Sequence, residues 1–329
     1  MSLFRFIYRS LPRAVGLAAV AAVALLITDP ILAQTYPSRP IRFIVPYPPG
    51  GGTDVVARIL TVHMSQSMGQ PVVVDNKPGA STILGTDLLA KAPPDGYTIG
   101  LYTTFDPVFF PKLPFDPFKD FEPISQIVAV PLVLVARSSL GVHSVQELVA
   151  LAKSRPGKLN FASIGNGTPH QIAMEWLKSM AGIDMAHIPY KGVAPATADV
   201  AAGQVDVMFT GTSTAFPLAK TGKAVALAVS TAKRLTAFPD TPSVAESGYP
   251  EFDFLTWYGL AAPAGTPRDI VLRINRELAA ALGQAETRTK FAGMGVVPTP
   301  TSPTEFSNFV RAEAQKLSHI IKITGVKPE

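Results

Sequence analysis

Short apolar runs alternate with amphipathic segments in the first third of the chain. Ile41–Val45 and Val72–Asp75 have the length and apolar character of buried strands, and Tyr97–Tyr102 follows a Pro-Pro-Asp-Gly turn. Apolar residues recur at helical spacing after Thr53–Asp54, and a second helix is expected over about Ser81–Ala90. This order predicts a β-α-β-α-β unit with parallel strands and helices on both faces.

The middle of the chain repeats the alternation. Leu132–Ala136 is a predicted strand with no glycine turn behind it, and we expect it to cross into a second lobe. Ser144 and Glu147 match a capping box, which predicts a helix to about Lys153. The other predicted elements are strands at Leu159–Ala162, Met185–Ile188, Val205–Phe209 and Ala224–Val229, a helix near Pro195–Ala202, and a short helix from Thr241–Pro242 to Gly248.

The last part of the chain is expected to return to the first lobe. Trp257–Ala262 has the pattern of a return strand, a helix follows Thr266, and a last helix covers about Thr304–Thr324. Two crossings between two lobes provide the material of a hinge. The predicted boundaries are residues 34–135 plus 258–329 for lobe 1 and residues 136–257 for lobe 2.

Two glycine-rich turns each lie between a predicted strand and a predicted helix, at Gly50–Thr53 and at Ser163–Thr168. Unpaired N–H groups and the helix dipole make such a helix start attractive to anions, and glycine lets the backbone approach a ligand closely. In the second turn Thr168 fits an N-cap, Pro169 fits the first helical position, and Gln171 completes a capping box. The two turns predict one anionic ligand held between the lobes.

Composition excludes several kinds of site. The 329 residues carry a formal charge of +5 without a run of lysine or arginine, which argues against nucleic acid. There is no cysteine, and the five histidines lack paired-ligand spacing, so we expect no disulfide, no metal and no cofactor. The GxxxxGK[ST] motif is absent, and His170 stands where GxGxxG requires glycine.

Four positions allow more than one interpretation. Gly211–Ala215 approaches GxSxG around Ser213 but lacks the final glycine, so a helix cap or turn is favoured over a hydrolase nucleophile. Asp54 is either a general base or a helix-start carboxylate, which is the commoner role. His170 either faces solvent or lines the ligand cleft. Asp206, within a predicted strand, either points into the cleft or pairs with a neighbour.

The N-terminus has the pattern of a signal peptide. Arg5, Arg9 and Arg13 precede the apolar core Ala14–Ile27, whose 14 residues are too few to span a bilayer, which needs about 20. Cleavage after Ala33 removes the three arginines and one aspartate and leaves a mature charge of +3. The alternative is a retained N-terminal anchor. The favoured interpretation predicts an exported, soluble protein with a signal peptide over residues 1–33.

Several segments in order resemble one protein family. They are YPSRPIRFIVPYPPGGGTDVVAR, VVVDNKPGA, PPDGYT, FASIGNGTPHQIA, HIPYKG, GQVDVMF, DTPSVAESGYP and WYGLAAPAGTP. Together they cover nearly the whole mature chain and are similar to the Bug family, the extracytoplasmic solute receptors of tripartite tricarboxylate transporters. The resemblance implies a two-lobed type II periplasmic-binding fold with a hinge of two crossover strands.

The resemblance also implies a function and a set of site residues. It implies a periplasmic receptor, without cofactor or metal, that clamps a small carboxylate between its two loops and delivers it to a permease of a large and a small subunit. We expect this receptor to be a monomer. The positions that match the family's loops and its GQVD segment are Tyr47, Pro49, Gly50, Gly51, Gly52, Thr53, Asp54, Ser163, Gly165, Asn166, Gly167, Thr168, His170 and Asp206.

One departure and two alternatives accompany the resemblance. Phe105 stands where a smaller polar residue is expected, which favours a less polar acid if its ring faces the cleft, whereas packing with Phe109 and Phe110 is the structural alternative. A receptor that signals to a sensor kinase is the alternative within binding proteins. A secreted hydrolase that uses Ser213 or Asp54 is the alternative among enzymes.

Overall fold

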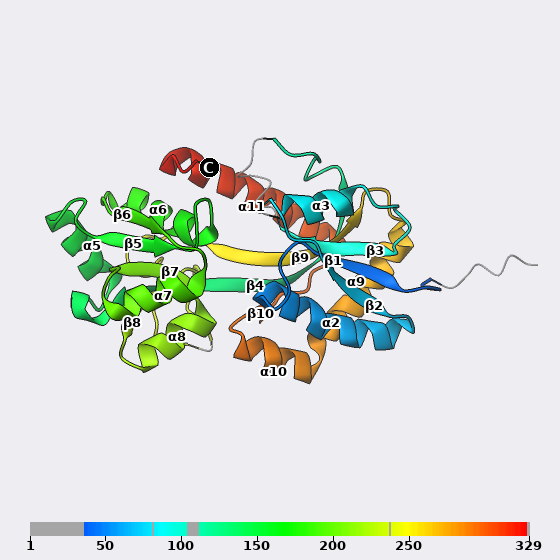
Figure 1. Ribbon diagram of the computed structural model, residues 1–329, viewed down its shortest axis with the longest axis horizontal. Helices are drawn as coiled ribbons and strands as arrows, with labels where there is room; N and C mark the ends of the chain where they lie inside the picture. The colour runs from blue at the N-terminus through cyan, green and yellow to red at the C-terminus, as the bar shows by residue number, and fades with distance from the viewer. Residues whose placement is uncertain (1–35, 81, 104–111, 237, 328–329) are drawn as a thin grey trace, which may run out of the picture. The chain divides into compact units, whose positions relative to one another are not determined.

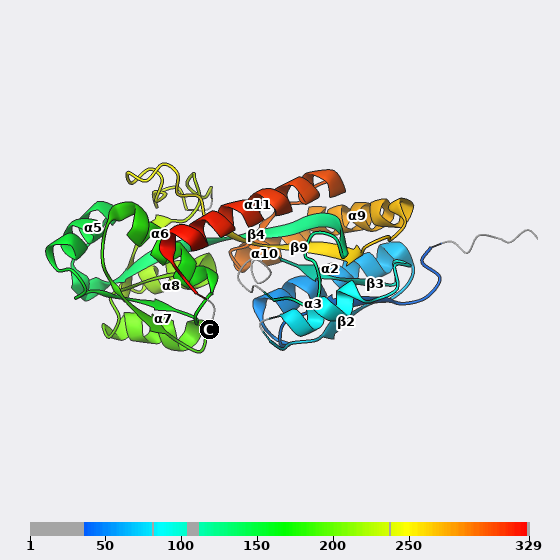
Figure 2. The same cartoon turned by 90° about the horizontal axis from the view of Figure 1, so that it is seen from above.

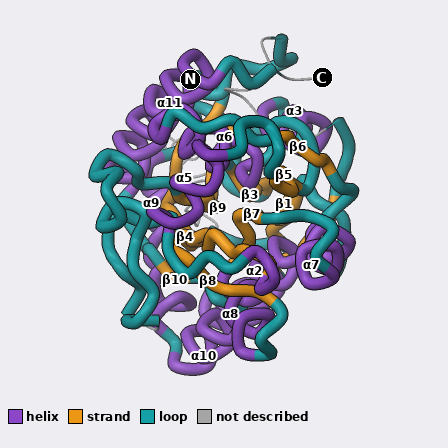
Figure 3. Tube along the Cα trace, turned by 90° about the vertical axis from the view of Figure 1, so that its left-hand side faces the viewer, coloured by secondary structure: helices purple, strands orange, loops and turns teal. Residues whose placement is uncertain are grey.

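The predicted alternation of strands and helices is present in the computed structural model. The structure describes residues 36–80, 82–103, 112–236 and 238–327. The chain divides into two compact units, residues 1–39 and 40–329, and every element below belongs to the second. Strands lie in the interior of this unit with helices around them (Figure 3), which confirms the predicted α/β class.

The first half-sheet contains the three parallel strands predicted in the N-terminal third. Its strands and connecting helices are β1 (Ile41–Val45), α2 (Gly52–Met68), β2 (Val72–Asn76), α3 (Ile83–Ala90) and β3 (Thr98–Tyr102). β1 lies between β2 and β3 and pairs in parallel with both. The β-α-β-α-β prediction is therefore confirmed, and the turn from β1 into α2 lies at the carboxyl end of a parallel strand.

The second half-sheet repeats this arrangement. Its strands and helices are α5 (Val145–Ser154), β5 (Asn160–Ser163), α6 (Pro169–Ala181), β6 (Ala186–Pro189), α7 (Val193–Ala202), β7 (Val207–Gly211), α8 (Thr212–Lys220) and β8 (Ala224–Val229). β5 pairs in parallel with β6 and with β7 (Figure 1). The helix-cap interpretation of Gly211–Ala215 is confirmed, because Gly211 is the N-cap of α8.

One long strand, β4 (Phe121–Arg137), belongs to both half-sheets. Its N-terminal part pairs antiparallel with β9 (Leu255–Pro263), and its C-terminal part pairs with β7 and β8. The predicted crossing strand Leu132–Ala136 is only the last part of this element. Pro123 and Pro131 break the strand signal upstream, and the register shifts just after Pro123. The return strand in β9 is confirmed, with slightly wider bounds than predicted.

A buried serine joins the strands where β4 passes from one half-sheet to the other. Ser230 Oγ accepts a hydrogen bond from the Leu132 N–H at 2.9 Å and donates to the Phe254 carbonyl at 2.6 Å. Its backbone bonds to the same two residues, since Ser230 N–H donates to the Leu132 carbonyl and Phe254 N–H donates to the Ser230 carbonyl. β4, the end of β8 and the start of β9 are thereby tied together at one point.

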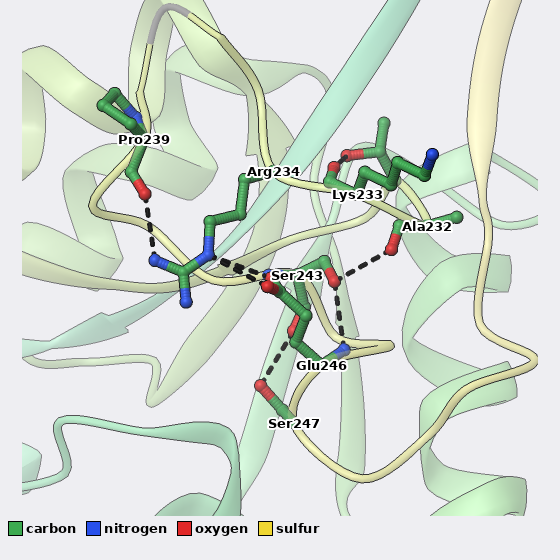
Figure 4. A network of polar contacts seen from close by, with 8 residues as sticks. Ala232, Lys233, Arg234, Pro239, Ser243, Glu246 and Ser247 are labelled. Atoms are coloured by element: carbon green, nitrogen blue, oxygen red, sulfur yellow. Dashed lines mark hydrogen bonds and ion pairs between the residues drawn. The ribbon is translucent and has the colours of Figure 1, made fainter.

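Residues 241–248 form turns and not the short helix predicted there. Ser243 Oγ accepts from the Glu246 N–H at 3.0 Å, and Glu246 Oε2 accepts from the Ser243 N–H at 2.8 Å, the reciprocal pair that begins many helices. Gly248 has a φ of 109°, which is not a helical backbone conformation, so the helical turn stops there after about one turn. Arg234 donates to both carboxylate oxygens of Glu246 and holds the segment in a polar network (Figure 4).

The C-terminal helix α11 (Pro303–Thr324) packs on the cores of both half-sheets. Phe306 and Val310 lie in a buried cluster with side chains of β3 and β9 from the first half-sheet. Leu317 and Ile320 lie in a second buried cluster with side chains of β5, α6 and β7 from the second half-sheet. Figure 2 shows α11 running alongside β4 and β9. This helix therefore connects the two cores.

The remaining elements are a short turn after β4, in the second half-sheet, and three elements that complete the first half-sheet. They are the 3-10 turn η1 (Ser138–Leu140), α9 (Arg268–Gly283), α10 (Ala285–Gly293) and β10 (Val297–Pro298). Helices were predicted for α9 and α11, but not for α10. The turn after α10 contacts the second half-sheet, where Thr212 Oγ1 donates to the Gly295 carbonyl at 2.7 Å.

Candidate functional site

A cavity of about 740 Å³ lies between the first turns of four helices. Its walls come from both half-sheets and from α11, and the loops that follow β1, β5 and β7 contribute to it. Ligands of open α/β sheets bind outside the carboxyl ends of the strands, which is where these loops lie. The predicted site residues on its wall are Tyr47, Pro49, Gly51, Gly52, Thr53, Asn166, Gly167, Thr168 and His170.

Four helices begin at this cavity without a side-chain cap. Their N-caps are Gly51 for α2, Thr168 for α6, Gly192 for α7 and Gly211 for α8, and none of them accepts a cap hydrogen bond on its side chain. The first N–H groups of a helix have no acceptor within the helix. Each helix start also carries the positive end of the helix dipole. The cavity wall is therefore rich in donors and has a positive potential.

The first loop is held from behind by Asp54. Its carboxylate Oδ2 accepts from the Gly50 N–H at 2.9 Å and from Arg58 Nε at 2.9 Å, while Oδ1 accepts from Asn76 Nδ2 at 3.0 Å. Arg58 is the main cause that lowers the pKa of Asp54 to about 2, with the Gly50 and Asn76 hydrogen bonds adding to the effect. The side chain is 4% exposed and does not line the cavity. The helix-start role of Asp54 therefore fits its position.

The second loop has a different cap from the one predicted. Thr168 Oγ1 donates to the Gly165 carbonyl at 2.7 Å instead of accepting from the helix. Gln171 Oε1 accepts from the Gly167 N–H at 2.7 Å, one residue before the N-cap. The capping-box prediction is wrong at this helix, because the hydroxyl of Thr168 is used to close the glycine loop.

The same bond recurs at three helix starts. The third helical residue accepts from the N–H of the residue before the N-cap in α2, α5 and α6. The pairs are Asp54 with Gly50, Glu147 with His143, and Gln171 with Gly167. In α2 and α6 this bond fixes the loop through its own backbone. The first-turn N–H groups of the helix are left for a ligand in the cavity.

Ser163 and His187 support the second loop from the sheet. Ser163 is fully buried, and its Oγ lies 2.6 Å from His187 Nε2, donates to the Gly165 carbonyl at 2.9 Å and accepts from the Gly165 N–H. Gln171 Nε2 lies 3.3 Å from the other ring nitrogen, Nδ1. The His187 ring stacks on Phe161 at 4.8 Å. Ser163 and Gly165 thus lie behind the cavity wall, and His187 is a supporting residue that sequence reasoning did not identify.

His170 is a neutral side chain on the cavity wall. It occupies the first turn of α6, and its Nδ1 is buried without a hydrogen-bond partner. Burial lowers the pKa of His170 to about 4, so the ring is uncharged at neutral pH. A neutral imidazole has one donor and one acceptor nitrogen. Of the two interpretations of His170, its position matches the one in which it lines the cleft.

Asp206 lies at the amino ends of the parallel strands, which is the opposite end from the cavity. Its Oδ1 accepts from Arg137 Nε at 2.8 Å and its Oδ2 from the Asn160 N–H at 2.8 Å. Asp206 precedes β7 and Asn160 begins β5, so both stand at the amino ends of parallel strands. The cavity lies at the carboxyl ends. Of the two interpretations of Asp206, pairing with a neighbour matches the structure.

Several wall residues were not identified from the sequence. They include Trp257 and Tyr258 of β9, Thr214 of α8, and Glu313 and Lys316 of α11. Lys316 Nζ lies 2.6 Å from Glu313 Oε1 and donates to the Asp253 carbonyl at 3.2 Å. Burial raises the pKa of Glu313, although Lys316 opposes this effect. Only the i, i+3 spacing of Glu313 and Lys316 is visible in the sequence.

The alternative chemistries find little support in the described residues. Ser213 lies on the wall, but among residues 36–80, 82–103, 112–236 and 238–327 no histidine or carboxylate is hydrogen-bonded to its hydroxyl. In the same ranges no three histidine or acidic side chains gather as metal ligands. No helix within them has both the length and the apolar character needed to span a membrane. Phe105 lies outside the described residues.

Comparison with known proteins gives one family. A model of the tripartite tricarboxylate transporter family receptor matches residues 56–326. Protein BugT of Bordetella pertussis is 37% identical over 306 residues, which is 92% of this chain and 94% of that protein. A UPF0065 protein of Pseudomonas sp. strain P51 is also 37% identical, over 88% of this chain and 87% of its own.

Solved structures with the same architecture include three close matches. R. palustris Rpa4515 with adipate is 33% identical with a TM-score of 0.78, over 89% of this chain and 100% of its own. MatC of Rhodopseudomonas palustris with bound malate is 31% identical with a TM-score of 0.73, over 87% and 100%. The periplasmic binding protein BugD is 33% identical with a TM-score of 0.74, over 89% and 100%. The two-lobed periplasmic-binding fold expected from the sequence is confirmed.

Proposed function

Because this chain belongs to the tripartite tricarboxylate transporter receptor family, we propose that it captures a small organic carboxylate in its cavity and delivers it to a transporter of that type. The observation that carries the proposal is the set of four helix starts without a side-chain cap that surround one cavity. Hydrogen bonds to a charged group contribute about 1.5–3 kcal/mol each. Three or four of them, less ordering costs, support about micromolar affinity.

The two lobes correspond to the two half-sheets. We retain residues 34–135 plus 258–329 for lobe 1 and 136–257 for lobe 2, with the second half of α11 packed on lobe 2. β4 and β9 form the hinge, and Ser230 marks its position. The first glycine loop, Gly50–Thr53, belongs to lobe 1, and the second, Ser163–Thr168, belongs to lobe 2. A carboxylate that contacts both loops therefore favours the arrangement in which the two lobes are closed on the ligand.

The remaining parts of the proposal concern the protein's setting. The apolar N-terminus and Ala33 support export with cleavage near that residue, and the family supports delivery to a permease of a large and a small subunit. We propose a monomer that binds without metal or cofactor and is not an enzyme. Adipate and malate in two related structures support a carboxylate as the ligand class.

A thermal-shift screen of purified residues 34–329 tests the proposal. Mono-, di- and tricarboxylates are added one at a time, and the melting temperature is followed by tryptophan fluorescence. A ligand at 100 times its dissociation constant stabilises the folded state by about 2.7 kcal/mol. We expect at least one acid to raise the melting temperature. If no acid does so, and an ester is hydrolysed in a reaction that Ser213→Ala abolishes, the hydrolase alternative holds instead.

Gly52→Val tests the assignment of the site itself. Gly52 is exposed on the cavity wall, its φ is negative, and an added Cβ meets no atom within 4 Å, so the variant is expected to fold and to obstruct the first glycine loop. Gly283→Val is the matched control, because Gly283 is also an exposed helical glycine with open space but lies away from the cavity. Wild-type affinity in Gly52→Val contradicts the assignment.

A further inference from the structure

Formal charge is confined to one place on the cavity wall. Among the described wall residues, Glu313 and Lys316 are the only acidic and basic side chains besides His170, and burial lowers the pKa of His170 to about 4. Both belong to α11, on the helix face that also carries Leu317 and Ile320. The charged pair is therefore set in an otherwise apolar part of the wall, away from the glycine loops in the sequence.

Lys316 has a hydrogen-bond donor available for a ligand. Its ammonium group has three N–H donors, of which the structure uses one for Glu313 Oε1 at 2.6 Å and one for the Asp253 carbonyl at 3.2 Å. The lysine side chain is 30% exposed and that of Glu313 is 17% exposed, so the cation is the more accessible partner. Two existing bonds hold the ammonium in place, and less side-chain entropy is lost when a ligand binds.

The surroundings favour an anion at this position over a cation. The helix starts of α2, α6, α7 and α8 direct their positive dipole ends at the same cavity. A ligand ammonium would face these ends, and the carboxylate of Glu313 is already paired with Lys316. A ligand carboxylate is instead attracted by these dipole ends, and the ammonium group of Lys316 still has a donor for it.

We propose that Lys316 binds the second acid group of a ligand whose first carboxylate lies at the glycine loops, and that Glu313 positions Lys316 for this contact. The inference rests on the proposed function, which supplies the first carboxylate. Lys316 is then the residue that selects acids with two anionic groups over acids with one. The apolar side chains of the cavity wall, among them Leu317 and Ile320, contact the carbon chain of the ligand.

Isothermal titration with pairs of acids of equal chain length tests this inference. Succinate, glutarate and adipate are compared with butyrate, valerate and hexanoate on wild type and on Lys316→Met. We expect wild type to prefer at least one diacid by about tenfold or more, the effect of one charge-assisted hydrogen bond. Lys316→Met is expected to lose that preference by weakening only the diacid, and Lys316→Arg is expected to retain it.

A matched pair on α6 supplies the control. Lys178 lies 2.9 Å from Glu175 at the same i, i+3 spacing, with side-chain exposures of 14% and 17%, but is not on the cavity wall. Lys178→Met is expected to leave the preference unchanged. If Lys316→Met does not fold because Glu313 is left unpaired, the double variant Glu313→Gln with Lys316→Met replaces it.

The contrary outcomes are distinct from one another. Equal weakening of mono- and diacids by Lys316→Met assigns the lysine a merely structural role and overturns the inference. Tighter binding of an ω-amino acid than of the diacid of equal length also overturns it, because Glu313 is then the recognition group. If wild type binds none of these six acids, the inference is overturned, whereas the proposed function is refuted only if the thermal-shift screen also finds no acid that binds.

Discussion

Replacing Asp54 by asparagine tests how the first glycine loop, Gly50–Thr53, is held. The carboxylate accepts hydrogen bonds from the Gly50 N–H, Arg58 Nε and Asn76 Nδ2, and only 4% of its side chain is exposed. Asparagine has one acceptor oxygen and one NH₂ group, so its nitrogen must face a donor on one side. A buried donor without an acceptor costs about 1–3 kcal/mol.

The loss of charge adds a second contribution. A pKa of about 2 for Asp54, against its ordinary value of 3.8, corresponds to at most about 2.4 kcal/mol of stability. Arg58 is 54% exposed, so solvent screens part of this interaction, and we reduce the contribution to about 1 kcal/mol. Together the two effects predict that Asp54→Asn lowers the free energy of unfolding by about 2–4 kcal/mol at pH 7.

The pH dependence of this difference follows from the direction of the pKa shift. The pKa of Asp54 is lower in the folded state, so its charge stabilises the fold above pH 3.8, and this contribution is lost as the pH falls toward about 2. Urea unfolding of wild type and Asp54→Asn at pH 7, 4 and 2.5, followed by circular dichroism, measures it. We expect the difference between the two proteins to shrink at low pH.

An exposed carboxylate provides the control for Asp54. Glu286 pairs with Lys290 at i, i+4 on α10 and is 63% exposed, so Glu286→Gln is expected to leave the unfolding free energy unchanged within error. A difference between wild type and Asp54→Asn that stays constant from pH 7 to 2.5 would refute the charge argument. An unfolding free energy of Asp54→Asn equal to that of wild type at pH 7 would refute the role of Asp54 in holding the first loop.

Two glycines give further predictions. Gly259→Ala places a Cβ 2.0 Å from the Phe306 ring in a closed core, so we expect about 1–3 kcal/mol of destabilisation in urea unfolding, and wild-type stability would contradict this packing. Gly295→Ala places a Cβ 1.9 Å from Thr212 Oγ1 at φ 68°, and a comparable loss is expected. Adding Thr212→Ala is expected to recover part of that loss, whereas strictly additive effects would show that the contact with Thr212 is not its cause.

Most of the fold was predictable because its elements have local signals. The apolar run Ile41–Val45 became a strand with identical bounds, and the turn chemistry around Thr168 and Pro169 located the start of α6. The secondary-structure predictions failed where tertiary contacts determine the local structure. The proline-containing part of β4 is a strand because β9 pairs with it, and the segment after Ser243 has a helix-start pattern but lacks the length of a helix.

The candidate site was predictable to the extent that it consists of backbone. The two glycine loops could be recognised because strand, glycine turn and helix follow one another in the chain. Long-range placement was not accessible in the same way. Asp206 occupies the wrong end of its strand, His187 reaches Ser163 only through the sheet, and Lys316 joins the cavity only because α11 packs beside it.

The position of α11 has a consequence for how the protein is made. Its 22 residues come after every described strand in chain order, yet they supply part of the cavity wall and pack on both cores. The sheet strands, all encoded earlier, can pair before this helix arrives. A nascent chain therefore lacks part of its binding wall until α11 has been synthesised and has packed on both cores.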